Sequence, residues 1–150
     1  MTPEIRLVQA AETVPIRLAI LRSGMPRESA LFPGDDAAET THFGAYQHGQ
    51  LVGVVSIYAA PCPERSLVSR ATQLRGMATL PKVRGLGYGC ALLQACSASA
   101  TAQGSELLWC NARAVAVGFY AKHGWEVISD EFQIPTAGPH FRMALALPGT

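Results

Sequence analysis

A glycine-rich stretch at Arg84–Gly89 constrains the fold of this chain more than any other feature. An apolar segment over residues 74–80 predicts a strand that leads into it, and small residues over 90–102 predict a helix that leaves it. Glycines carry no Cβ, so a ligand can approach the backbone closely. Because amide N–H groups and the positive end of the helix then converge, the sequence predicts a phosphate-binding strand–loop–helix unit.

Two familiar phosphate loops do not fit this stretch. It lacks the Gly-Lys-Ser/Thr ending of a Walker loop, and its glycine spacing is not that of a dinucleotide-binding unit. The pattern Arg-x-x-Gly-x-Gly after a strand resembles the pyrophosphate loop of the GNAT N-acetyltransferases, which hold acetyl-CoA. The alternative is an ordinary glycine-rich turn between a strand and a helix.

Length and composition narrow the class of protein. A chain of 150 residues fits one domain over 1–150, and a net charge of +1 with 15% charged residues indicates no nucleic-acid surface. The longest apolar run, residues 51–60, is too short to span a bilayer. Glu4 and Arg6 interrupt the first apolar segment, unlike a signal peptide. We therefore expect a cytoplasmic protein with no membrane partner.

The cysteines favour reduced, mostly buried thiols. They form no C-x-x-C pair, and no histidine follows at zinc spacing, so we expect no metal. These cysteines are Cys62, Cys90, Cys96 and Cys110.

Apolar periodicity predicts alternating strands and helices without repeats. Thr13 is a candidate cap for a helix with Pro15 in its first turn, ending near Gly24, and Gly124 closes a helix over 115–123. Proline, glycine and an acidic pair make residues 25–41 an irregular loop on the substrate side. The strands are expected at 5–9, 43–46, 51–58, 74–80, 107–110, 125–128 and 141–147, with a turn at 48–50.

This order of elements matches the GNAT fold over nearly the whole chain. The fold class expected is therefore α/β (α+β), the GNAT acyl-CoA N-acyltransferase fold with a central mixed sheet flanked by helices. Four separated segments narrow the resemblance to the branch of glyphosate N-acetyltransferases: Leu21–Arg22, Gln73–Thr79, Leu108–Arg113 and Gly138–His140. The resemblance implies acetyl transfer from acetyl-CoA to the amine of a small anionic, amino-acid-like or phosphonate acceptor, by a monomer or homodimer.

The resemblance also implies how acetyl-CoA is held. In GNAT proteins the strand before the glycine loop pairs with the pantetheine arm, and a main-chain N–H polarises the thioester carbonyl. The loop would hold the pyrophosphate, and Asn111 would bond the pantetheine amides. The expected cofactor-binding residues are Met77, Ala78, Thr79, Arg84, Gly85, Leu86, Gly87, Tyr88, Gly89 and Asn111.

Three arginines are candidates for binding the acceptor: Arg22, Arg75 and Arg113. Guanidinium forks match carboxylate or phosphonate oxygens two at a time, and the matching positions in the resembled enzymes clamp the acceptor. Each arginine has an alternative, because Arg22 could stabilise a helix C-terminus and the other two could form ion pairs. The candidate partners for these ion pairs are Asp35, Asp36 and Glu106.

His140 is the candidate general base, since a histidine titrates near neutrality and can take the proton of the acceptor ammonium. Tyr120 matches the GNAT tyrosine that protonates the leaving thiolate, although a core aromatic would look the same. The other histidines, at 42, 48 and 123, have weaker claims. Two other functions stay open: a cysteine-based acyltransferase using Cys110, and a GNAT domain that only senses acetyl-CoA or an anionic metabolite.

Overall fold

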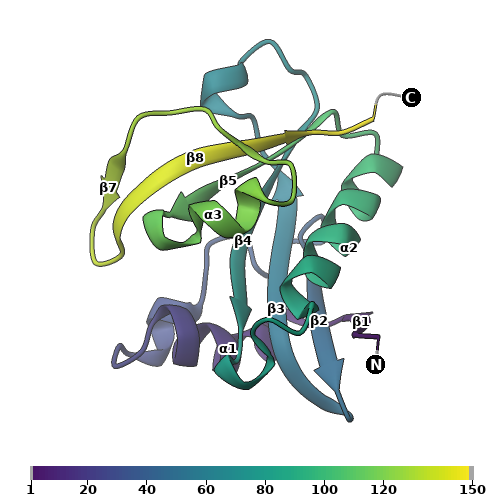
Figure 1. Ribbon diagram of the computed structural model, residues 1–150, viewed down its shortest axis with the longest axis vertical. Coiled ribbons are helices and arrows are strands. Elements are labelled where there is room, and N and C mark those ends of the chain that lie inside the picture. The colour runs from purple at the N-terminus through teal and green to yellow at the C-terminus, as the bar shows by residue number, and fades with distance from the viewer. Residues whose placement is uncertain (1, 149–150) are drawn as a thin grey trace. The chain divides into compact units, whose positions relative to one another are not determined.

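The structure is a computed structural model that describes residues 2–148 (Figure 1). Its residues cluster into two compact units. The first unit contains the chain up to Tyr58 together with Arg75–Ala98. The second contains Ala59–Leu74 and the chain from Ser99 onward. Strand β4 (Ala71–Thr79) and helix α2 (Tyr88–Ala102) contribute residues to both units. The expectation of one domain over residues 1–150 stays a prediction.

The first unit is built on an antiparallel meander. Its strands lie in the order β1-β2-β3-β4, and β2 and β3 form a hairpin whose turn residues His48 and Gly49 have φ of 50° and 78°. This hairpin is confirmed, and its turn has the paired positive φ of a type I′ turn. The elements besides β4 and α2 are β1 (Glu4–Leu7), α1 (Ala10–Leu21), η1 (Arg27–Ala30), β2 (Thr41–Gln47), β3 (Gln50–Ala59) and η3 (Pro81–Val83).

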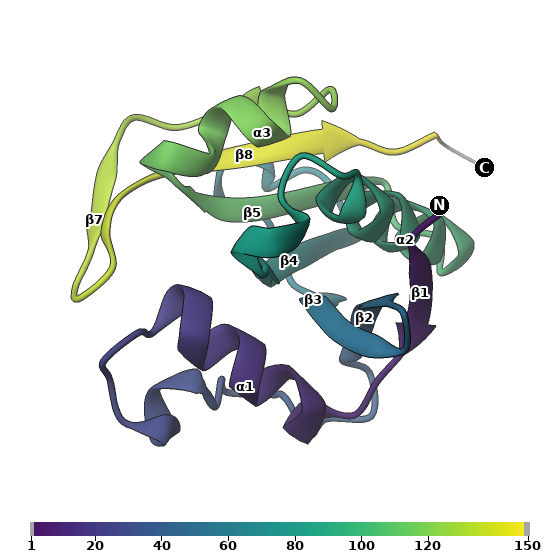
Figure 2. The same cartoon turned by 60° about the horizontal axis from the view of Figure 1, so that its bottom comes forward.

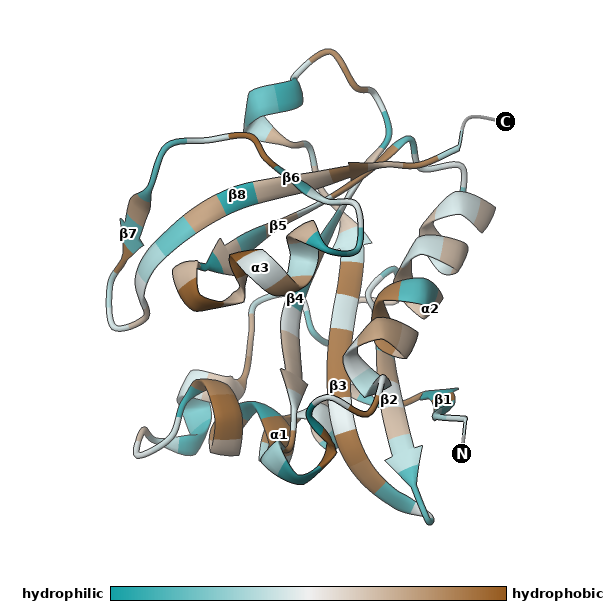
Figure 3. Ribbon diagram, in the orientation of Figure 1, coloured by the Kyte–Doolittle hydropathy of each residue, from teal (hydrophilic) through white to brown (hydrophobic). Residues whose placement is uncertain are grey.

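Strand β3 is buried on both faces, which explains its continuous apolar sequence (Figure 3). On one face Val54 clusters with Ile16 of α1 and with Ala78. On the other face a Cβ added at Gly53 would lie 3.1 Å from Leu92 of α2. Helices α1 and α2 therefore cover opposite faces of β3 within the first unit.

Helix α1 begins earlier than its apolar pattern predicts. Gln9 is the N-cap, and its backbone N–H donates to the Glu12 carboxylate at 2.6 Å. Thr13 lies inside the helix and donates its hydroxyl to the carbonyl of Ala10 at 2.7 Å. The prediction that Thr13 caps the helix is wrong, because the first turn is solvent-facing and carries no apolar periodicity.

The second unit contains the mixed part of the sheet. Strand β5 pairs with β4 in parallel and with β8 antiparallel, and helix α3 lies along β8 (Figure 2). The strand order is β4-β5-β8-β6, and β7 also pairs with β8. The elements are η2 (Pro63–Arg65), β5 (Leu107–Arg113), η4 (Ala114–Ala116), α3 (Val117–Ala121), β6 (Glu126–Val127), β7 (Phe132–Ile134) and β8 (Gly138–Ala146).

Two strands of the second unit are longer than predicted. Strand β5 continues to Arg113, and β8 begins at Gly138 instead of residue 141. His140 therefore lies in a strand and is buried, whereas the sequence predicted a strand that begins just after it. Strand β7, which the sequence did not predict, pairs with this early part of β8. None of the helices in residues 2–148 is long and apolar enough to cross a membrane.

Gly76 interrupts the regular geometry of β4 with a φ of +67°. A Cβ at this position would lie 3.2 Å from Nε of Arg17 and 3.3 Å from the ring of Phe32. Arg17 is fully buried and held by Asp35, so it can move little. Glycine is therefore required here for two reasons, the left-handed backbone and the close approach of two side chains.

We expect Gly76→Ala to destabilise the protein more than Gly24→Ala. Both glycines have positive φ, so each alanine costs about 1 kcal/mol of strain. Only position 76 adds a collision, because a Cβ at Gly24 meets nothing within 4 Å. Overpacking at Gly76 should cost about 1–3 kcal/mol more. Urea unfolding measures the difference, and equal losses for the two variants would show that the collision is unimportant.

Candidate functional site

The glycine loop Arg84–Gly89 follows η3 in the first unit, and its last two residues are the first two of α2. Gly85 and Gly87 have φ of +79° and +91°, and a Cβ at either would meet nothing within 4 Å. The first intrahelical bond of α2 runs from the N–H of Ala91 to the carbonyl of Gly87, so the preceding N–H groups have no acceptor within the helix. The loop therefore offers an open backbone surface at a positive helix end, which suits a pyrophosphate.

The side chains of this segment differ in exposure. Arg84 and Leu86 are exposed, whereas Tyr88 is buried and can offer a ligand only its main chain. In β4, Met77 and Thr79 are partly buried and Ala78 packs under α1. The structure thus brings most of the predicted cofactor residues together in the first unit, along one continuous piece of chain.

Three arginines of the first unit surround the ring of Phe32. Their guanidinium carbons lie 3.9 Å (Arg17), 5.3 Å (Arg22) and 5.4 Å (Arg75) from the ring centre, within cation–π range. Arg75 also lies 4.6 Å from the ring centre of Tyr58. The loop over 25–41 supplies the central ring, so it is part of the candidate site. We call Arg17, Arg22, Phe32, Asp35 and Arg75 the Phe32 cluster.

Asp35 is the acidic centre of the Phe32 cluster. Its Oδ2 accepts from Nη1 of Arg17 at 2.6 Å and from the N–H of Phe32 at 3.0 Å, and its Oδ1 accepts from Nη2 of Arg75 at 3.0 Å. Burial acts to raise the pKa of Asp35, but the hydrogen bonds from Arg17 and Phe32 and the two positive charges together lower it. The ion pair considered for Arg75 from the sequence is therefore confirmed.

Arg22 lies at the C-terminal end of α1. Its Nη1 donates to the carbonyl of Leu21 at 3.1 Å, which is the helix-terminus contact considered from the sequence. The guanidinium of Arg22 also lies over the ring of Phe32, so Arg22 belongs to the Phe32 cluster in spite of its bond to Leu21.

Sequence reasoning missed Arg17, which is fully buried. It donates to the carbonyl of Ala30, to Asp35 and, at 3.1 Å, to the hydroxyl of Ser56. One signal could have revealed it, because Arg17 follows Val14 by three residues and therefore lies on the apolar stripe of the predicted helix. A charged residue at such a position needs a buried partner.

His42 belongs to the same network and is also buried. Its Nε2 lies 2.9 Å from the carbonyl of Asp35, and its Nδ1 lies 2.6 Å from the hydroxyl of Ser56. Because a carbonyl only accepts, Nε2 carries the proton, and in the neutral ring Nδ1 accepts from Ser56. Both ring nitrogens are thus engaged, which gives His42 a structural role.

In the second unit, β5 and β8 bring the other site residues together. Arg113 is the register partner of His140, and Asn111 is the partner of Arg142. Register partners share a face of the sheet, so these four side chains project from one side. Phe132 of β7 pairs with His140 from the other edge, and the two rings stack with centroids 6.0 Å apart.

The ring of His140 is oriented by its own strand. Its Nδ1 lies 2.8 Å from the carbonyl of Gly138, so Nδ1 carries a proton and donates. In the neutral ring Nε2 is then the basic nitrogen. This is the tautomer that a general base acting through Nε2 requires.

Arg142 is a second residue that sequence reasoning missed. Its Nε donates to Oδ1 of Asn111 at 3.1 Å, and its Nη1 forms an ion pair with Glu64 at 2.8 Å. The amide oxygen of Asn111 is therefore occupied, and its NH₂ group is the part that can donate to a ligand carbonyl.

Tyr120 is buried and packs against Phe119 and Trp125, with ring centroids 5.3 and 5.2 Å away. Its side chain also hydrogen-bonds Cys110. Burial raises the pKa of the Cys110 thiol to about 12, and the bond from Tyr120 lowers it only in part. A thiolate is therefore strongly disfavoured, which argues against an acyl-enzyme on this cysteine.

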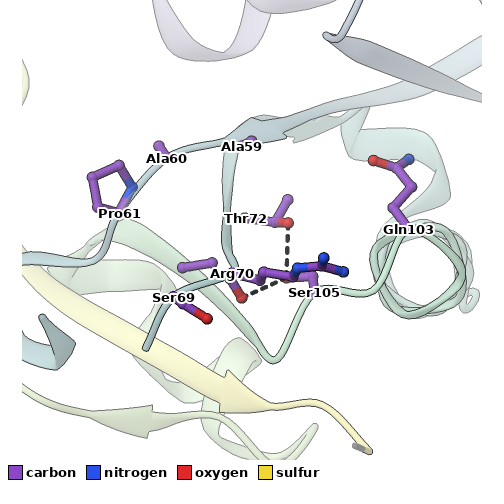
Figure 4. Close-up of a pocket in the computed structure, with 9 residues that line it drawn as sticks. Ala59, Ala60, Pro61, Ser69, Arg70, Thr72, Gln103 and Ser105 are labelled. Carbon is purple, nitrogen blue, oxygen red and sulfur yellow. Dashed lines mark hydrogen bonds between the residues drawn. The ribbon is translucent and has the colours of Figure 1, made fainter. Parts of the chain in front are cut away.

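A cavity of about 470 Å³ lies in the second unit, beside the end of β3 and the segment after α2 (Figure 4). No predicted site residue lines it. Its hydroxyls already have partners: Thr72 donates to Ser105 at 2.9 Å, Ser105 lies 3.3 Å from the carbonyl of Arg70, and Ser69 donates to the Glu106 carboxylate at 3.1 Å. The cavity is therefore separate from the residues that the sequence singled out.

Comparisons with known proteins agree with this fold. Residues 31–147 match the acetyltransferase (GNAT) domain family. The chain is 33% identical to an uncharacterised N-acetyltransferase, YitI, of Bacillus subtilis. The alignment spans 140 residues, which is 93% of each of the two chains.

Two solved structures of low sequence identity share the fold. Arabidopsis thaliana NAA60, in complex with a bisubstrate analogue, has a TM-score of 0.80 at 11% identity and covers 99% of this chain and 100% of its own. FeeM, an N-acyl amino acid synthase from uncultured soil microbes, has a TM-score of 0.78 at 15% identity, covering 98% and 92% respectively.

We expect Asp35→Asn to destabilise the protein by about 3–5 kcal/mol at neutral pH, because it leaves buried Arg17 without its counter-ion. The pKa of Asp35 is lowered in the folded state from its ordinary value of 3.8, so its stabilisation is complete above that value. The stabilisation is lost as the pH falls through the folded-state pKa. The advantage of the wild type over Asp35→Asn should therefore hold from pH 7 to about pH 5 and shrink below about pH 4.

Urea unfolding across this pH range measures the effect. Asp36→Asn is the matched control, since Asp36 is exposed, and it should change stability by less than about 0.5 kcal/mol. A difference between wild type and Asp35→Asn that did not depend on pH below 4 would contradict the assignment.

Proposed function

The chain belongs to the GNAT family of N-acetyltransferases, and we propose that it transfers the acetyl group of acetyl-CoA directly to the amine of a small anionic acceptor. The acceptor class proposed is an amino-acid-like compound or a phosphonate. The observation that carries this proposal is the gathering of Arg22 and Arg75 around Phe32 in a chain with few charges. Such guanidinium groups suit an acidic ligand.

Acetyl-CoA is the co-substrate of the family, and the residues of the first unit fit it. We assign its pyrophosphate to Arg84–Gly89, because the loop has an open backbone surface at the N-terminus of α2. The pantetheine arm would pair with Met77–Thr79 and accept from the NH₂ group of Asn111. A main-chain N–H near Met77 would stabilise the negative charge that develops on the thioester oxygen.

His140 is the proposed general base. The acceptor ammonium would give a proton to Nε2, and the free amine would attack the acetyl carbonyl carbon. The new C–N bond forms and the C–S bond breaks. The attacking nitrogen loses its second proton as the amide forms, and the CoA thiolate takes up one proton, so the net products are the amide, CoA thiol and one proton on His140. By resemblance Tyr120 supplies the proton that the thiolate takes up, although its bond to Cys110 also suits a core role.

Arg113, the third arginine that the sequence singles out, lies in the second unit. Arg113 pairs in register with His140, which supports a role close to the base. FeeM is described as an N-acyl amino acid synthase, and an amino acid would supply both the amine and the acidic group that this proposal needs. A glyphosate-like phosphonate has the same two groups, so the resemblance to that branch is retained as a proposal.

We expect Arg22→Ala, Arg75→Ala and Arg113→Ala each to raise the acceptor KM by about tenfold or more while acetyl-CoA binding stays nearly unchanged. A screen of amino acids and phosphonates by mass spectrometry first identifies an acceptor, and steady-state kinetics then measure the variants. A neutral amine of similar size is the control, since it needs no guanidinium. Equal losses for the neutral amine would contradict the anion receptor, and acetyl-CoA binding without any acetylated product would favour a sensor.

We expect His140→Gln to lower kcat by about 10²- to 10⁴-fold while acetyl-CoA still binds, because the amide cannot accept the ammonium proton. His123→Gln is the matched control and should keep full activity, since this residue follows α3 and its ring packs on Phe119, with centroids 5.1 Å apart. An unchanged kcat for His140→Gln at pH 7 would rule out this base.

A further inference from the structure

Asp35 is a loop residue that forms ion pairs with arginines from two other elements of the first unit. It lies between η1 and β2, and it pairs with Arg17 of α1 and Arg75 of β4. The carboxylate is nearly buried, with 9% of its side chain exposed, so this is not a solvent-facing ion pair. One acidic group thus serves two guanidinium groups.

The contacts of Arg75 divide its guanidinium into an occupied and an unoccupied part. Nη2 donates both to Oδ1 of Asp35 and to the carbonyl of Pro33, which uses its two hydrogens. Nε is buried and has no partner, and Nη1 makes no hydrogen bond to any of residues 2–148. Only the Nη1 end therefore remains for a ligand that approaches from solvent.

The same guanidinium contacts two aromatic rings. Phe32 and Tyr58 are 5.4 Å and 4.6 Å from its central carbon. Because Nη2 is held by two hydrogen bonds and the guanidinium also packs on two rings, the side chain of Arg75 has little rotational freedom. A free arginine side chain loses rotamer entropy when it binds a ligand, and this one has already lost part of it.

We propose that Asp35 is a positioning residue for the acceptor: it holds Nη2 of Arg75 so that Nη1 is presented, already oriented, to the acidic group of the acceptor. This inference rests on the proposed function, because it requires Arg75 to bind the acceptor. Asp35 itself does not touch the acceptor. Since both hydrogens of Nη2 are used, Arg75 contacts the anion through one nitrogen, and the two-nitrogen fork suggested by the sequence does not form there.

The alternative role for Asp35 is purely structural, through buried Arg17. A double-mutant cycle separates the two roles. Asp35→Asn, Arg75→Gln and the double variant are compared with wild type for the acceptor KM, the acetyl-CoA KM, kcat and the melting temperature. Asp36→Asn is the matched control for removing one negative charge from the same loop and should leave all four quantities unchanged.

We expect Asp35→Asn to raise the acceptor KM about tenfold and the acetyl-CoA KM less than about twofold. In the Arg75→Gln background, Asp35→Asn should cause no further rise in acceptor KM, although it should still lower the melting temperature through Arg17. An equal rise in acceptor KM in both backgrounds would overturn the proposal, because Asp35 would then act independently of Arg75.

Tyr58→Leu gives a second test if Asp35→Asn does not fold. It removes the nearer ring from Arg75 and leaves the pair between Arg17 and Asp35 in place. We expect a several-fold rise in acceptor KM that disappears in the Arg75→Gln background, and an unchanged KM would overturn the idea of a pre-oriented guanidinium. If Arg75→Gln alone leaves the acceptor KM unchanged, the receptor in the proposed function fails as well. If only the Asp35 and Tyr58 variants are silent, the receptor stands and the positioning role alone fails.

Discussion

The ion pair between Arg17 and Asp35 is the contact on which the first unit depends. Arg17 is fully buried, so its charge is tolerable only with a fixed counter-ion, and Asp35 supplies one at 2.6 Å. That requirement ties the loop after α1 to the helix, because Asp35 and Phe32 must both reach Arg17. It also determines the residue at position 76, where any side chain would collide with Arg17 and Phe32. An irregular segment of sequence is thereby held in one conformation.

The same ion pair links stability to the chemistry of the candidate site. Asp35 serves Arg17, which is structural, and Arg75, which is a proposed acceptor ligand. In the second unit the sheet register has the corresponding role: it sets Arg113 beside His140, while Gly138 orients the imidazole ring through Nδ1. In the first unit a nearly buried carboxylate orients Arg75, and in the second unit a main-chain carbonyl orients His140, in both cases before any ligand binds. Such preorganisation is how a protein reduces the entropic cost of binding and catalysis.

Most of the fold could be predicted because its signals are local. The glycine loop, the hairpin turn at His48 and Gly49, and the alternation of apolar strands with helices each depend on residues close in sequence. The errors arose where a pattern was weak. The first turn of α1 has no apolar residue of the stripe, and β7 is a short strand that exists only because it pairs with the start of β8. For the same reason the predicted strand begins at residue 141, just after His140, instead of at Gly138.

The sequence by itself determined the family, the glycine loop with its positive helix end, and the residue types available for acid–base and anion-binding chemistry. These follow from local spacing, since a glycine or a helix start acts on its immediate neighbours. Only the tertiary structure decided how the charges pair: that Arg17 is buried, that Arg75 has one end occupied by Asp35, and that Arg142 occupies the amide oxygen of Asn111. Partners in these contacts are separated by 18 to 40 residues in the chain, and no periodicity records which distant side chain will meet a buried charge.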